Sequence, residues 1–170
     1  MDGTGAGTGP LQDRALLDAA LERALEEGEL ALRTGDVPVG AVVLDASGRE
    51  VGAGRNEREA AGDPTAHAEV LALRAAARRL GGWRLAGCTL VVTLEPCTMC
   101  AGAAVLSRVD RIAYGARDAK AGAAGSLWDL VRDPRLNHRP EVVPPDLLSP
   151  RLGERCADLL TDFFSGRRFG

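Results

Sequence analysis

Two short stretches decide the fold of this chain, His67-Ala68-Glu69 and Pro96-Cys97-Thr98-Met99-Cys100. In the second stretch, two cysteines three positions apart follow a proline, a residue favoured at the first position of a helix. This spacing predicts both thiols on one side of the first helical turn, where unbonded backbone N–H groups favour negative charge. Two thiolates held in this way form half of a tetrahedral zinc site.

The third ligand is expected from the first stretch. The chain has two histidines, His67 and His138, and His67 stands where a helix is predicted to begin. Two helix N-termini meet at one ion when neighbouring strands deliver them side by side. The ligands His67, Cys97 and Cys100 would leave the fourth position of zinc to water, which is the arrangement of catalytic sites.

Glu69 supplies a group that a structural zinc site would not need. Residues two apart point about 200° apart on a regular helix, so His67 and Glu69 can flank one ion only where the chain enters the helix. Glu69 is therefore predicted to move protons between water and substrate rather than to bind the metal. His-x-Glu followed by Pro-Cys-x-x-Cys is the signature of zinc deaminases, whose metal lowers the pKa of a bound water to about 7.

The hydrophobic pattern around these stretches predicts helices that alternate with strands. Apolar residues recur at helical spacing over 11–33, and further helices are expected from near Thr65, from Pro96, and over 151–164. Strands are predicted at 39–44, 50–54, 89–94, 109–114 and 141–143, with a loop at 56–65 and a short helical stretch at 128–131. This order implies a sheet with helices on both faces.

The composition is that of a globular protein without disulfides. The chain has 170 residues, of which 45% are hydrophobic and 26% charged, enough for one core. No apolar run is long enough to cross a membrane, and residues 1–10 lack the features of a secretory signal. We expect a tail at 1–10, one zinc-dependent deaminase domain at 11–170, and a cytoplasmic location in which the four cysteines stay reduced.

The charge of the chain is unevenly distributed. The formal net charge is -3, which does not indicate a nucleic-acid binder, yet residues 108–139 carry seven basic residues against four aspartates. The basic residues are Arg108, Arg111, Arg117, Lys120, Arg132, Arg135 and Arg139. This segment fits either a solvated surface or a local phosphate-binding face on an acidic protein.

Several residues allow more than one interpretation. A Cys-x-x-Cys pair also fits a redox pair or a structural zinc site, for which Cys88 or His138 would be the fourth ligand. Cys88 and Cys156 otherwise fit buried core cysteines. Asn56 alone fits a turn cap, and Asp118 fits either a solvated ion-pair cluster or a charged binding loop. A non-catalytic zinc or RNA-binding module is the alternative from another functional class.

Over about residues 12–168, the chain resembles the bacterial tRNA-specific adenosine deaminase family. The zinc stretches alone indicate the cytidine deaminase-like superfamily, whereas Arg117-Asp118-Ala119-Lys120 and Gly122-Ala123-Ala124-Gly125-Ser126 favour the tRNA enzymes within it. Further matching motifs are Val37-Pro38-Val39-Gly40-Ala41-Val42, Asp63-Pro64-Thr65-Ala66-His67-Ala68-Glu69, Thr93-Leu94-Glu95-Pro96-Cys97, Met99-Cys100-Ala101-Gly102-Ala103, Asn137-His138 and Asp162-Phe163-Phe164. Residues 144–153 depart from the family pattern, and this segment is longer than the corresponding one in the family.

The resemblance implies a three-layer α/β/α fold of the cytidine deaminase-like type, with a five-stranded mixed sheet. It implies a homodimer with one Zn²⁺ per subunit and a bound water or hydroxide. The site residues it implies are His67, Cys97 and Cys100 as metal ligands, Glu69 as proton donor and acceptor, and Asn56, Asp118 and Lys120 as substrate-binding residues.

The activity implied by the resemblance is hydrolytic deamination of adenosine to inosine at the wobble position of a tRNA anticodon loop. The partner expected is an anticodon stem-loop, with an arginine tRNA as the family's usual substrate, and no membrane. Unpaired loop nucleotides are easier to splay into a pocket than paired ones. The alternative is deamination of a free cytosine or guanine base, nucleoside or nucleotide, which needs the same metal chemistry.

Overall fold

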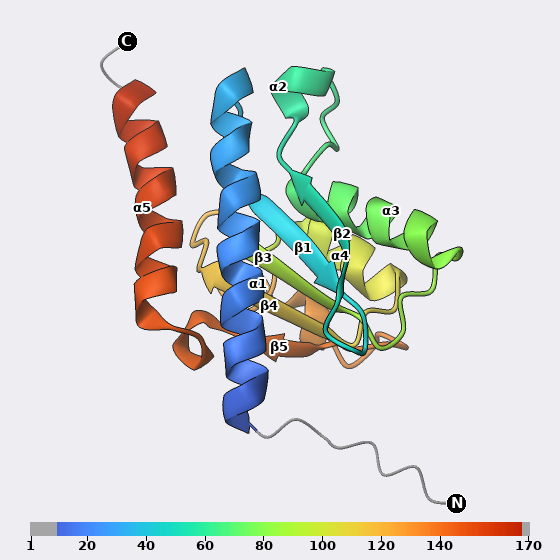
Figure 1. Ribbon diagram of the computed structural model, residues 1–170. Helices are drawn as coiled ribbons and strands as arrows, with labels where there is room; N and C mark the ends of the chain where they lie inside the picture. Colours follow the sequence, from blue (N-terminus) through green and yellow to red (C-terminus); the bar gives the residue numbers. More distant parts are fainter. Residues whose placement is uncertain (1–9, 168–170) are drawn as a thin grey trace, which may run out of the picture.

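The central sheet of the computed structural model has the strand order β2-β1-β3-β4-β5 (Figure 1). The structure describes residues 10–167. The strands are β1 (Gly40–Leu44), β2 (Glu50–Arg55), β3 (Thr89–Leu94), β4 (Arg111–Ala116) and β5 (Glu141–Val143). β1 runs antiparallel to β2 and β3, while β3, β4 and β5 are parallel, so the predicted five-stranded mixed sheet is confirmed.

Helices cover both faces of this sheet. α1 (Pro10–Ala31) and α5 (Pro150–Arg167) pack on one face, and α3 (Ala68–Leu80) and α4 (Thr98–Leu106) pack on the other (Figure 1). Successive strand residues point to opposite faces, so Val91 lies in the core beneath α1 whereas Leu90 and Val92 lie in the core beneath α3 and α4. The predicted three-layer α/β/α architecture is confirmed.

One edge of the sheet gathers the chain segments that carry the predicted site. Leu94 at the end of β3 pairs with Ala116 at the end of β4, and Gly40 at the start of β1 pairs with Arg55 at the end of β2. The segments that follow β2, β3 and β4 therefore leave the sheet at the same edge. In an open α/β sheet, this is where ligands bind.

α3 lies unusually close to β2 because glycines face it. A Cβ atom on Gly54 would lie 2.6 Å from the Ala68 carbonyl oxygen and 2.8 Å from the Ala72 backbone nitrogen. Real Cβ atoms do not approach backbone this closely, so only glycine allows the contact. The first turn of α3 is thus seated on the end of β2, which fixes the position of the residue that precedes it, His67.

Two predicted helix starts were wrong. The helix expected from Pro96 begins at Thr98, because Cys97 has extended backbone dihedrals (φ -71°, ψ 177°) and acts as the N-cap. The helix expected near Thr65 begins at Ala68 for the same reason, with His67 as the N-cap. Helix boundaries are the least certain part of sequence patterns.

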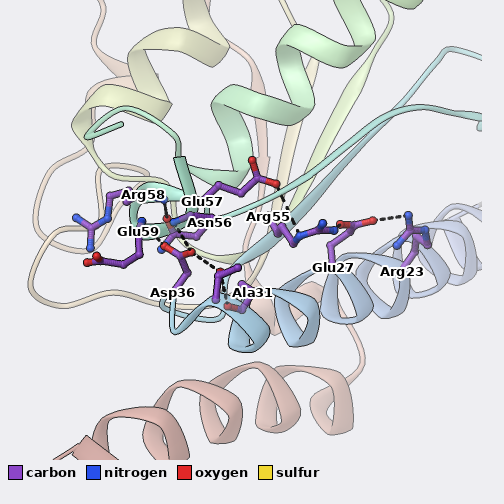
Figure 2. Close-up of polar contacts among 11 residues, drawn as sticks. Arg23, Glu27, Ala31, Asp36, Arg55, Asn56, Glu57, Arg58 and Glu59 are labelled. Atoms are coloured by element: carbon purple, nitrogen blue, oxygen red, sulfur yellow. Dashed lines mark hydrogen bonds and ion pairs between the residues drawn. The ribbon is translucent and has the colours of Figure 1, made fainter. Parts of the chain in front are cut away.

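The predicted loop at 56–65 contains a short helix, α2 (Arg58–Ala61), which the sequence pattern did not indicate. Its N-terminal N–H groups are bound by a residue far away in sequence, Asp36. The Asp36 carboxylate accepts hydrogen bonds from the Glu59 and Ala60 backbone N–H groups at 2.7 and 3.2 Å (Figure 2). Burial raises the pKa of Asp36, but these bonds and the one from Thr34 offset that effect and lower it.

The remaining elements follow the predicted order, and their boundaries lie within about three residues of those predicted. The short helical stretch at 128–131 corresponds to the 3-10 turn η2 (Leu130–Arg132), and further 3-10 turns are η1 (Leu32–Thr34) and η3 (Pro145–Leu147). The predicted tail at 1–10 falls on residues 1–9, outside the described residues, except that Pro10 is the first residue of α1. The domain prediction for 11–170 stays a prediction. Among the described helices, none is long and apolar enough to span a membrane.

Candidate metal centre and active site

Three donor atoms converge between the starts of α3 and α4. The Nδ1 atom of His67 lies 3.6 Å from the Cys97 Sγ atom and 3.5 Å from the Cys100 Sγ atom. All three donor atoms lie within 4.8 Å of one another. The sequence predicted this set, and the structure brings it together.

The spacing of the donors fits zinc. A tetrahedral zinc ion with Zn–S distances of about 2.3 Å and Zn–N distances of about 2.0 Å holds sulfur and nitrogen ligands roughly 3.5 Å apart. The observed distances of 3.5 and 3.6 Å agree with this value. One imidazole and two thiols are also donors that zinc prefers.

The electrostatics of the thiols indicate a site built for a cation. The hydrogen bond between the two cysteines lowers the pKa of Cys97, while the same bond and burial raise the pKa of Cys100. Contact with Cys97 also raises the pKa of His67. The protein alone thus stabilises one thiolate of the pair, and a divalent cation would stabilise both.

Glu69 lies beside the three donors without joining them. Because His67 is still extended (φ -79°, ψ 151°), Glu69 in the first turn of α3 can face the same space. Its side chain is 4% exposed and is within hydrogen-bonding reach of Cys100. Burial raises the pKa of the Glu69 carboxyl to about 7, which suits a group that both takes and gives protons near neutral pH.

Neither candidate for a fourth protein ligand reaches the centre. Cys88 is buried in the core beneath α3 and α4, and the His138 Nε2 atom lies 2.7 Å from the Val109 carbonyl oxygen. Within residues 10–167, the metal-binding group consists of His67, Cys97 and Cys100 alone. The arrangement is the three-ligand type found in catalytic zinc sites.

Comparison with known proteins agrees with this geometry. The family model for the cytidine and deoxycytidylate deaminase zinc-binding region matches residues 14–116. The tRNA-specific adenosine deaminase of Bacillus subtilis is 44% identical over 144 residues, covering 85% of this chain and 86% of the relative. That of Haemophilus influenzae is 46% identical over 145 residues, covering 85% and 81%.

The chain belongs to the tRNA-specific adenosine deaminase family. It is a zinc-binding deaminase, as the motifs predicted.

Solved structures give the same fold. A structure from studies of A-to-I editing by tRNA:A34 deaminases at the wobble position of transfer RNA has a TM-score of 0.71 and 41% identity, covering 74% of this chain and 96% of that one. A guanine deaminase from Bacillus subtilis has a TM-score of 0.57 and 36% identity, covering 66% and 71%.

In this deaminase, Asn56 directly follows β2, at the same edge of the sheet as the metal centre. Its side-chain oxygen accepts a hydrogen bond from the Arg58 N–H group at 3.2 Å (Figure 2). Its side-chain nitrogen donates to the Val37 carbonyl oxygen at 3.2 Å. The next N–H group, that of Glu57, donates to the carbonyl oxygen of Ala66, directly before His67. Asn56 therefore caps a turn, and its predicted contact with substrate stays a prediction.

Asp118 and Lys120 lie in the loop that follows β4. The Asp118 side chain accepts hydrogen bonds from the Lys120 and Ala121 N–H groups at 2.9 and 3.2 Å, which shapes the loop. The Lys120 side chain is exposed. The loop is bound to the residue directly before Cys97, because the Ala123 N–H group donates to the Pro96 carbonyl oxygen at 2.8 Å.

Most of the basic segment 108–139 is neutralised by ion pairs. These pairs are Arg111 with Asp13, Arg117 with Asp146, Arg132 with Asp129, and Arg135 with Asp133. Among the described residues, Arg108, Lys120 and Arg139 are the members of this segment without an ion pair. The solvated-surface interpretation therefore fits four of the seven basic residues.

Two buried carboxylates near the site were missed by the sequence interpretation. No sequence motif singles out Asp36, and Glu95 stands only within the motif Thr93-Leu94-Glu95-Pro96-Cys97. Both are nearly inaccessible, with 1% and 2% of their surfaces exposed. The signal that was available for Glu95 is an acidic residue placed directly between a buried strand and Pro96-Cys97.

Substitution of single residues is expected to distinguish the zinc ligands from the other cysteines and histidine of the chain. Cys97→Ser should weaken zinc binding at least tenfold, because a hydroxyl replaces a thiolate. Cys88→Ala and His138→Asn should keep one zinc per chain, which elemental analysis after dialysis against a chelator would measure. Loss of zinc in either of these two control variants would restore the four-ligand interpretation.

Proposed function

We propose that this deaminase converts adenosine to inosine at the wobble position of a tRNA anticodon loop, consuming water and releasing ammonia. The observation that carries the proposal is the buried Glu69 carboxyl beside a three-ligand metal centre. The choice of substrate is supported by the tRNA-specific relatives, which match 85% of the chain.

In the proposed mechanism, His67, Cys97 and Cys100 hold the zinc ion. A zinc ion supplies acidity to a coordinated water, whose pKa it lowers to about 7. The chain supplies the fixed geometry: His67 and Cys97 are helix caps, and Cys100 is fully buried at the first turn of α4. Burial keeps bulk water away from the Cys100 thiol, whereas Cys97 is partly exposed.

Glu69 moves the protons. Its carboxylate takes a proton from the attacking water and gives it to ring N1 of adenine as the bond from the water oxygen to C6 forms. It then takes the proton of the new hydroxyl group on C6 and gives it to the amino group, so that the C6–N bond breaks and ammonia leaves. A carboxyl with a pKa of about 7 exists in both protonation states at neutral pH, so it can do both tasks. Each proton taken is returned, so the residue ends the cycle unchanged.

The substrate would be bound by residues around the same edge of the sheet. We propose that Asn56 contacts the target nucleoside and that Asp118 and Lys120 hold the RNA around it. Lys120 suits this role because its ammonium group is exposed and makes no ion pair among the described residues. An unpaired anticodon-loop base can be splayed out at lower free energy than a base in a duplex. The family resemblance favours an arginine tRNA and a cytoplasmic location.

A homodimer is part of the proposal, and one face of α4 supports it. Thr98, Gly102 and Leu106 recur at helical spacing, and Leu106 is 69% exposed. Trp128, which is 58% exposed, lines a shallow cavity with Thr98 at the start of the same helix. Large exposed apolar side chains gathered on one face suit contact with a second copy.

Sedimentation velocity would test the dimer. We expect the mass of two 17.8 kDa chains at micromolar concentration. Leu106→Glu should shift the protein toward monomer, because it places a charge in the apolar contact. Leu147→Glu is the matched control, since Leu147 is 60% exposed on η3, which packs against α5. A monomeric wild type, or equal effects of the two substitutions, would contradict the proposal.

A second candidate is deamination of a free base, favoured by the structural match to a guanine deaminase. The metal centre and Glu69 would act in the same way on guanine or cytosine. A free base, however, would not need the exposed Lys120 or the charged loop around it. The tRNA-specific relatives are more similar to this chain in sequence, at 44% and 46% identity against 36% for that guanine deaminase.

Incubation with an anticodon stem-loop carrying a wobble adenosine, and in parallel with free adenosine, guanine and cytidine, would decide the substrate. We expect inosine in the stem-loop, detected by nucleoside mass spectrometry. Glu69→Ala should retain zinc and lower kcat on the order of 10²- to 10⁴-fold, because proton transfer is lost. Glu27→Gln is a control that changes a buried carboxylate of α1, ion-paired to Arg23 and Arg55 (Figure 2).

The proposal would fail if wild-type protein deaminated free guanine or cytidine and left the stem-loop unchanged. Full activity of Glu69→Ala would refute the proton-transfer role while leaving the substrate assignment standing.

A further inference from the structure

Glu95 is a buried carboxylate between β3 and the cysteine stretch. Its side chain is 2% exposed, and its backbone N–H group donates to the Ala116 carbonyl oxygen at 2.8 Å, which extends the pairing of β3 with β4. Two residues further on lies the metal-site residue Cys97. The mechanism proposed above gives this carboxylate no task.

The Glu95 carboxylate binds the loop that follows β4. It accepts hydrogen bonds from the backbone N–H groups of Ala124 and Ser126, at 3.2 and 3.1 Å, and from the Ser126 hydroxyl. No lysine or arginine among the described residues forms an ion pair with it. Its negative charge is therefore satisfied by loop donors alone, and hydrogen bonds to a charged acceptor are the strong ones.

Gly122 fits against the same carboxylate. A Cβ atom on Gly122 would overlap the Glu95 Oε2 atom and would lie 2.5 Å from the Asp118 carbonyl oxygen. The Gly122 N–H group also donates to that carbonyl oxygen, at 2.9 Å. Only glycine leaves enough space here. Gly122 therefore contacts both the Glu95 carboxylate and the Asp118 backbone, and links the two.

Two further contacts complete the attachment of the loop. The Ala123 N–H group donates to the Pro96 carbonyl oxygen at 2.8 Å, and the Ala124 carbonyl oxygen accepts from the Tyr114 hydroxyl at 3.4 Å. The segment 118–126 is therefore bound to the two residues that directly precede Cys97. If the loop moved away, the Glu95 carboxylate would lose its three loop donors, which is unfavourable.

We propose that Glu95 is a positioning residue that fixes the 118–126 loop against the cysteine turn and thereby sets how tightly substrate RNA is held. The effect passes through Asp118 and Lys120, so it rests on the function proposed above. Glu95 touches neither the metal donors nor the reacting base in this scheme. Its contribution is expected in substrate affinity rather than in the chemical step.

Amide hydrogen exchange on the zinc-loaded protein tests the attachment directly. In Glu95→Ala, exchange of the Ala123, Ala124 and Ser126 amides should accelerate at least tenfold, because their acceptors are removed or displaced. Exchange in α1 and zinc content should stay as in the wild type. Glu95→Gln keeps the shape and one acceptor oxygen, so it should restore most of the protection.

Steady-state kinetics on the anticodon stem-loop test the consequence. Glu95→Ala should raise KM on the order of tenfold with a much smaller change in kcat, and Ser126→Ala should raise it less. Gly122→Ala should resemble Glu95→Ala, since it displaces the loop while keeping the carboxylate. Glu27→Gln is again the matched control and should leave KM unchanged.

The inference would be overturned by unchanged loop exchange and KM in both Glu95→Ala and Ser126→Ala. It would also be overturned if Glu95→Ala lowered kcat and zinc content without raising KM, which a merely structural role would do. Failure of the proposed function has a different signature, a zinc-loaded wild type that does not deaminate the stem-loop. The exchange measurement still decides the attachment of the loop in that case.

Discussion

Three donor atoms on two different helices must meet within the bonding distance of one ion, and this constraint explains much of the structure. His67 and Cys97 are both N-caps, so each leaves its helix in extended conformation with its side chain toward the same space. The glycine at position 54 lets α3 sit directly on β2, and the parallel pairing of β3 with β4 places the cysteine turn at the same edge. The metal centre thus depends on backbone contacts at a distance from it.

The sequence was sufficient for the type of fold and for the ligand set, for identifiable reasons. Strand and helix periods alternate clearly, and the few cysteine and histidine side chains leave little choice of ligands. The helix starts were misplaced because proline preference at Pro96 suggested an earlier start than the ligand geometry allows. A metal ligand that is also the N-cap of a helix keeps extended backbone dihedrals, and the helix propensity of a residue does not indicate this.

Other features depend on contacts between distant segments and could not be predicted. The α2 helix forms where Asp36, more than twenty residues earlier, binds its first N–H groups. Glu95 likewise acquires its role only when the loop around Ser126 folds onto it. The basic segment shows the opposite case, since its arginines pair with aspartates such as Asp129 and Asp133 that were visible in the sequence.

X-ray absorption spectroscopy at the zinc edge tests the central claim most directly, because it counts the donor atoms in solution. The account predicts two sulfur ligands at about 2.3 Å, one imidazole nitrogen at about 2.0 Å, and one further light atom, as expected of water in the open position. A third sulfur or a second imidazole would mean that the protein closes the site. That result would contradict a catalytic centre built from His67, Cys97 and Cys100.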